Sequence, residues 1–269
     1  MAQDTKRFHR IFVVVDPTRM IQPALIKGEW IAEREGAELV LYACIHDERF
    51  TDAEAEQQTE VELTREWMDR LARPARDKGI NVQIRVEWDA DWRNAVLAAA
   101  ISENSDLVVK MASRHTALGR RLKTTSDLVL VQGCACPVLL VDSHRMWKNR
   151  RLLAAVKLKP QDEAHEQLNK NLLDLSHQIA SQVELNLYAV TAYKGEDLYF
   201  DRQKFADLCG LPRDSVFAGE GAPERVIAKV SDEIGADMIV IGNPGVGGRN
   251  TAVLLIDQAR TDILFLPES

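Results

Sequence analysis

This chain of 269 residues lacks long apolar runs. No stretch approaches the roughly 18 uninterrupted apolar residues that a transmembrane helix needs. The opening residues, MAQDTKRFHR, also lack the apolar segment of a secretory signal peptide. We therefore expect a cytoplasmic protein that has no membrane partner.

Cysteines and clear metal-ligand patterns are scarce. The four cysteines are Cys44, Cys134, Cys136 and Cys209, too few for a disulfide framework. A single residue separates Cys134 from Cys136, whereas zinc ribbons use two to four. His46, His115 and Asp16 could converge at one sheet edge as metal ligands, but their spacing does not require it. We predict no bound metal.

Basic residues are too few to balance the acidic ones, and the formal net charge is −7. Residues 151–269 carry −6 of this charge, whereas residues 1–150 carry −1. A negative chain disfavours nonspecific binding to nucleic acid and to anionic membranes, so neither is an expected partner.

Common catalytic motifs are missing as well. The chain has no G-x-S-x-G elbow, no P-loop lysine, no H-E-x-x-H pair and no convincing nucleophile beside a base. This pattern favours a protein that acts by binding rather than by fast chemistry.

An internal repeat is the strongest feature that is present. Four apolar segments of the first half recur in the same order in the second half, at offsets of 141, 146, 131 and 125 residues. The pairs are Arg10–Asp16 with Arg151–Lys157, Glu38–Ala43 with Glu184–Ala189, Ser105–Lys110 with Ala236–Ile241, and Cys136–Val141 with Thr261–Leu266. The repeat predicts two domains, 1–145 and 146–269, joined near the polar segment 142–150.

Helix-length segments separate these strands in both halves. The expected helices are Pro23–Glu35, Asp52–Lys78, Arg93–Glu103, Glu163–Gln182, Asp201–Cys209 and Pro223–Ile234. Gly36 and Gly235 follow two of them and are expected to cap their carboxyl ends. Apolar strands that alternate with helices predict an α/β fold, in which each half forms a doubly wound, five-stranded parallel sheet.

Binding sites in such sheets lie beyond the carboxyl ends of the strands. The most informative segment there is the loop 242–251, which contains Gly242, Gly245, Gly247, Gly248, Asn250 and Thr251. Its backbone amides could hold a phosphate at the start of a helix, or the glycines could serve only a tight strand-to-helix connection. Lys157, at the end of the strand that opens the second half, could hold a phosphate or carboxylate, or could be a solvated lysine.

The repeated strands together with three short motifs resemble the universal stress protein family in its tandem form. The motifs are the Val-Asp that ends the first strand, Ser-Asp-Leu-Val-Val with its echo Ala-Asp-Met-Ile-Val, and the final Pro-Val-Leu-Leu-Val. The resemblance covers nearly the whole chain. It implies two Rossmann-like domains of the adenine nucleotide alpha hydrolase-like type, with strand order 3-2-1-4-5. It also implies a cytoplasmic role in stress resistance, ATP or another adenine nucleotide as ligand, and at most a weak ATPase activity.

Members of this family that bind ATP use an aspartate after the first strand and a loop of the form G-x-x-G, nine residues, then G-S or G-T. The first half keeps Asp16 and the hydroxyl residue Thr125, but Met111, Arg114 and Thr124 stand at the glycine positions.

The second half shows the opposite departure from the pattern. It keeps Gly242 and Gly245 in a loop about six residues shorter, with Asn250-Thr251 as a remnant of the last pair, while Lys157 replaces the aspartate. We therefore expect a degenerate nucleotide or anion site, and we place it in the second domain rather than the first.

The alternative is an interaction scaffold that binds no ligand. The edge strands Val138–Val141 and Ile263–Leu266 would then pair within the chain, so that the fused domains form a pseudo-two-fold dimer. Either function implies a protein partner, and the sequence does not decide whether two chains also form a homodimer.

Overall fold

Strands and helices alternate along the whole described chain. The computed structural model describes residues 8–50, 53–113, 125–158, 160, 162–193, 201–243 and 251–268. They cluster into two units: residues 8–113, 125–130 and 136–144 form the first, and residues 131–135 with the described part of 145–268 form the second. Within these residues, no helix combines the length and apolar character needed to cross a bilayer.

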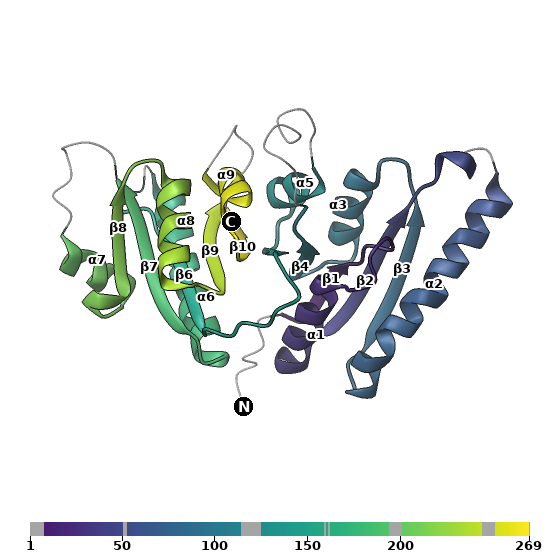
Figure 1. The fold of residues 1–269 in the computed structure, drawn as a ribbon, viewed down its shortest axis with the longest axis horizontal. Coiled ribbons are helices and arrows are strands. Elements are labelled where there is room, and N and C mark those ends of the chain that lie inside the picture. The colour runs from purple at the N-terminus through teal and green to yellow at the C-terminus, as the bar shows by residue number, and fades with distance from the viewer. Residues whose placement is uncertain are drawn as a thin grey trace. The chain divides into compact units, whose positions relative to one another are not determined.

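The first unit contains a parallel sheet with the order β3-β2-β1-β4-β5 (Figure 1). Its strands are β1 (Arg10–Val14), β2 (Glu38–Ile45), β3 (Val82–Trp88), β4 (Leu107–Met111) and β5 (Val138–Val141). The helices along this part of the chain are α1 (Pro23–Glu35), the short 3-10 helix η1 (Glu48–Phe50), α2 (Glu54–Asp77), α3 (Trp92–Ser102) and α5 (Ser126–Gly133).

The second unit repeats this topology in the order β10-β9-β6-β7-β8. Its strands are β6 (Arg151–Ala155), β7 (Asn186–Tyr193), β8 (Val216–Glu220), β9 (Met238–Asn243) and β10 (Asp262–Pro267). Its helices are α6 (Glu163–Gln182), α7 (Arg202–Cys209), the 3-10 helix η2 (Arg213–Ser215), α8 (Pro223–Ile234) and α9 (Thr251–Gln258). Counted from its own first strand, each half has the order 3-2-1-4-5, which confirms the predicted fold class.

Local sequence sets the ends of several helices. Helices α1, α6 and α8 have the bounds that the sequence predicts. Gly36 and Gly235 cap two of them with φ of 61° and 59°, a left-handed conformation that glycine adopts without steric cost. Parallel connections are right-handed, so α6 and α8, which lead in opposite directions along the sheet, cover opposite faces of it. The amino-terminal parts of the two helices therefore flank the carboxyl edge of the sheet from opposite faces, where ligands bind in doubly wound folds.

The strand registers define equivalent positions in the two sheets and correct one sequence alignment. Arg10 pairs with Glu38, and Arg151 pairs with Asn186, so Asn186 is the equivalent of Glu38. The predicted match of Glu38 with Glu184 was wrong by two residues, because Glu184 precedes β7 and has a φ of 53°. A two-residue shift leaves every side chain on the same face, so apolar alternation alone cannot detect it. The other three offsets agree with the registers.

Candidate functional site

A cavity of about 440 Å³ lies at the carboxyl edge of the second sheet. It adjoins β6 and β9, between which the chain order reverses, and ligands in doubly wound folds bind at such points. Its polar lining residues are Lys157, His165, Asn169, Thr191 and Thr251. Its apolar lining includes Leu168, Leu172, Val190, Ile227 and Ile241. The cavity therefore offers an apolar interior and a few polar groups, the usual character of a small-molecule site.

The backbone of Lys157, a predicted site residue, is fixed by one side chain of α6. Asn169 accepts a hydrogen bond from the Lys157 backbone N–H at 3.1 Å and donates one to its carbonyl oxygen at 2.6 Å. The Lys157 ammonium forms no ion pair with the described part of the chain. A positioned backbone and an unpaired cation make Lys157 available to an anion at the cavity.

His165 is held in place at the start of α6 by Asp162. The Asp162 carboxylate accepts hydrogen bonds from the His165 backbone N–H at 2.9 Å and from its ring Nδ1 at 2.6 Å. These two bonds, and more weakly the charge of Lys157, hold the pKa of Asp162 below its ordinary value. Because an ionised carboxylate only accepts hydrogen bonds, Nδ1 of His165 is the donor in this contact.

Gly242 is needed for packing, whatever else it does. A Cβ at this position would lie 2.7 Å from Cδ2 and 2.8 Å from Cγ of Leu168, closer than real contacts allow. Packing against Leu168 is therefore a sufficient reason for a glycine at position 242. Thr251 is the first residue of α9 and lines the cavity. The remaining predicted loop residues, Gly245, Gly247, Gly248 and Asn250, lie outside the described residues.

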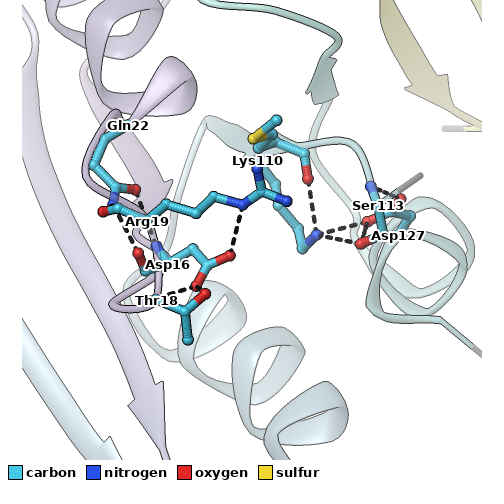
Figure 2. Close-up of polar contacts among 8 residues, drawn as sticks. Asp16, Thr18, Arg19, Gln22, Lys110, Ser113 and Asp127 are labelled. Carbon is cyan, nitrogen blue, oxygen red and sulfur yellow. Dashed lines mark hydrogen bonds and ion pairs between the residues drawn. The ribbon is translucent and has the colours of Figure 1, made fainter. Parts of the chain in front are cut away.

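The aspartate of the first unit, Asp16, is engaged by its own loop (Figure 2). Its carboxylate accepts hydrogen bonds from the Thr18 hydroxyl at 2.6 Å and from Nε of Arg19 at 3.0 Å. The Gln22 side chain closes the same loop through the Asp16 backbone and the Arg19 carbonyl. Burial raises the pKa of Asp16, but the bonds from Thr18 and Arg19 outweigh it, so the pKa lies below the ordinary value.

A buried ion pair lies at the same edge of the first unit (Figure 2). Nζ of Lys110 lies 2.6 Å from Oδ1 of Asp127, and the two side chains are only 8% and 1% exposed. Ser113 donates two hydrogen bonds to the Asp127 carboxylate, one from its backbone N–H at 2.7 Å and one from its hydroxyl at 3.1 Å. Thr125 accepts a bond from the Leu128 N–H at 3.3 Å and so caps α5. Arg114 and Thr124, also predicted for this site, lie outside the described residues.

The registers show which residues of the two units occupy equivalent positions at this edge. Ile241 stands in β9 where Lys110 stands in β4, and Ala252 is the second residue of α9 as Asp127 is of α5. Both Ile241 and Ala252 line the cavity. Lys157 likewise follows β6 by the same two residues as Asp16 follows β1. The second unit thus replaces a buried ion pair by apolar side chains and an internally held carboxylate by an unpaired cation.

Sequence reasoning missed the side chains that complete this picture. It did not find His165, Asn169 or Thr191, nor the pairing of Lys110 with Asp127. A lysine inside the apolar run Leu-Val-Val-Lys-Met was a signal for the buried pair, because a lysine there needs a buried anion.

No group of three or more metal-ligating side chains occurs among the residues that the structure describes. The His46 ring packs against Trp88, with ring centroids 5.8 Å apart. His115, the third member of the metal alternative, lies outside the described residues.

Comparisons with known sequences find relatives along nearly the whole chain. The profile of the universal stress protein family matches residues 7–142. Two curated proteins named universal stress protein E are each 27% identical to the chain. The alignment with the one from Photorhabdus laumondii is 299 positions long, gaps included, and covers 96% of this chain and 95% of the relative. The alignment with the one from Escherichia coli K12 is 300 positions long, gaps included, and covers 96% of this chain and 94% of the relative.

Solved structures show the same two-unit fold. A functionally unknown protein from Pseudomonas aeruginosa PAO1 has a TM-score of 0.78 and 23% identity, over 98% of this chain and 94% of its own. A universal stress protein from Archaeoglobus fulgidus has a TM-score of 0.73 and 14% identity, over 97% and 96%. Because the family profile covers half of the sequence and the relatives align along nearly all of it, the chain belongs to the universal stress protein family.

Proposed function

We propose that this protein is a cytoplasmic stress-response protein that acts by binding a small anionic ligand in the cavity of the second unit. An adenine nucleotide is the first candidate, because the family includes members that bind one. The observation that carries the proposal is the contrast between the two carboxyl edges. In the first unit, Lys110 is paired with Asp127 and Asp16 with Arg19. In the second, a cavity lies beside Lys157, which forms no ion pair with the described residues.

Charge and shape at the cavity suit an anion with an apolar or planar body. The Lys157 ammonium and the amino-terminal end of α9, which begins at Thr251, both attract negative charge. The side chains of Leu168, Ile227 and Ile241 offer apolar contact to the rest of the ligand. The cavity volume of about 440 Å³ falls within the range of about 300–1,000 Å³ that is usual for small-molecule sites.

Chemistry beyond binding has little support at this edge. Among the described polar residues of the lining, no nucleophile is hydrogen-bonded to a base. We therefore propose a binding protein in which any ATPase activity is weak, and whose bound state is read by a protein partner.

Isothermal calorimetry with ATP, ADP and AMP at millimolar concentration tests the proposal. Binding of at least one nucleotide is expected, with one site per chain. Lys157→Ala should weaken it about 10- to 100-fold, because a hydrogen bond to a charged group contributes roughly 1.5–3 kcal/mol. Lys229→Ala is the matched control, since Lys229 is an exposed lysine of the same unit and does not line the cavity. An absence of heat with all three nucleotides would sink the nucleotide proposal.

A scaffold that binds no ligand is the second candidate, and the buried pairing of Lys110 with Asp127 favours it for the first unit. In this case the fused domains form a pseudo-dimer through Val138–Val141 and Ile263–Leu266 and present a surface to a protein partner. A nucleotide that co-purifies with the protein, seen by native mass spectrometry, would contradict the scaffold. A crystal structure with these two strands on opposite outer faces would rule out the pseudo-dimer.

A further inference from the structure

The hydroxyl group of Thr191 is buried without a hydrogen-bond partner. The residue is only 2% exposed, and its Oγ1 forms no hydrogen bond. Buried polar side chains nearly always have a partner, because leaving one unsatisfied costs free energy. An orphaned hydroxyl in a folded protein therefore calls for a reason.

The sheet itself does not require a hydroxyl at this position. Thr191 lies in β7, where it pairs with Ala218 of β8. The registers place it at the position that Ala43 occupies in β2 of the first unit, and Ala43 is fully buried. The equivalent strand thus packs well with no polar atom there.

Thr191 differs from Ala43 in a second respect, because it lines the cavity of the second unit. The sheet residues around it in this lining are apolar: Ala155, Val190, Ala192 and Ile241. The cation of the cavity, Lys157, comes from the end of β6, and the amide of Asn169 already binds the Lys157 backbone. Among the described sheet residues that line the cavity, Thr191 has the one side chain with a hydroxyl.

We propose that Thr191 is a specificity-determining residue of this cavity, and the inference rests on the proposed binding function. Its hydroxyl hydrogen-bonds an uncharged polar group on the body of the ligand, while Lys157 holds the anionic group. A rotation of about 120° about χ1 moves the hydroxyl to the position that the methyl group holds, and in this way it can turn toward a ligand in the cavity. The ligand class is an organic anion whose apolar or planar body carries a hydrogen-bonding group.

Two substitutions and two probes test this role by calorimetry. Thr191→Val removes the hydroxyl and keeps the branched shape, whereas Thr191→Ser keeps the hydroxyl. AMP has hydrogen-bonding groups on its ring system, and phenyl phosphate has none on its ring. Thr191→Val should weaken AMP binding about tenfold and leave phenyl phosphate binding unchanged, and Thr191→Ser should keep AMP binding within about threefold of the wild type.

A ligand-free measurement separates this role from a structural one. Without ligand, Thr191→Val should unfold at the same temperature as the wild type or at a higher one, because the variant loses an unsatisfied group. A lower unfolding temperature would show that the fold needs the hydroxyl and would overturn the inference.

The inference and the proposed function fail in different ways. If Thr191→Val binds AMP as tightly as the wild type, while Lys157→Ala still weakens it, the inference falls and the proposed function stands. If the wild type binds neither probe, the proposed function falls and the inference falls with it.

Discussion

Removal of one partner from the Lys110–Asp127 ion pair tests whether the pair is buried in the first unit as the structure shows. Lys110→Ile and Asp127→Ala each copy the residue at the equivalent position of the second unit. A single substitution leaves one buried charge without its counterpart, which typically costs about 3–5 kcal/mol. Ser113 still donates two hydrogen bonds to Asp127 in Lys110→Ile, so about 3 kcal/mol is expected for that variant. Such a loss is a large part of the roughly 5–15 kcal/mol that stabilises a typical protein.

The double variant, with both substitutions, should be more stable than the two single losses predict. It removes both charges together and leaves mainly the Ser113 N–H without its acceptor, so we expect a loss of about 2 kcal/mol. Urea unfolding followed by tryptophan fluorescence measures this, because four of the five tryptophans lie in residues 8–113. Single losses below about 1 kcal/mol, or losses that simply add in the double variant, would refute the argument from burial.

Three further predictions concern groups outside this pair. Gly242→Ala should lower the free energy of unfolding in urea by about 1–3 kcal/mol, because its Cβ overlaps Leu168. Leu168→Ala in the same chain should recover part of that loss. An unchanged unfolding midpoint for Gly242→Ala would contradict the packing. Burial raises the pKa of the Cys209 thiol to about 12, so the thiol stabilises the fold below its unfolded pKa of about 8.5 and loses this contribution as pH rises toward 12. Cys209→Ala should therefore lessen the loss of stability over that range, and an identical pH profile would be evidence against it. Arg19→Ala should raise the pKa of Asp16 in a carboxyl NMR titration. It should reduce the free energy of unfolding above pH 4 by less than about 1 kcal/mol, because both side chains are half exposed. An unmoved pKa would mean that the hydrogen bond is absent in solution.

Local patterns and the repeat were enough to predict the parallel α/β fold and most helices, whereas the strand order followed only from the family resemblance. Proline at the start of α8 and glycine after α1 and α8 are local signals, so their bounds follow from short segments. The position of β7 could not be found in this way. Alternation with a period of two fits Glu184 as well as Asn186 at the head of the strand, and only pairing with β6 decides between them.

The candidate site was predictable at its edge but not in its interior. Lys157 and Gly242 follow recognisable strands, so their place at the carboxyl edge could be inferred. The contact of Gly242 with Leu168, 74 positions away in sequence, depends on how α6 packs on β9. The orphaned hydroxyl of Thr191 is likewise a property of packing, because threonine in a strand is ordinary until its surroundings are known.

A methyl-detected NMR titration with AMP tests the central claim most directly, because it locates the ligand in one unit or the other. The account predicts saturable shifts for Leu168, Ile227 and Ile241, which line the cavity, and none for Val109 and Leu130 in the first unit. Saturable shifts at Val109 and Leu130 with the cavity methyls unmoved would contradict it.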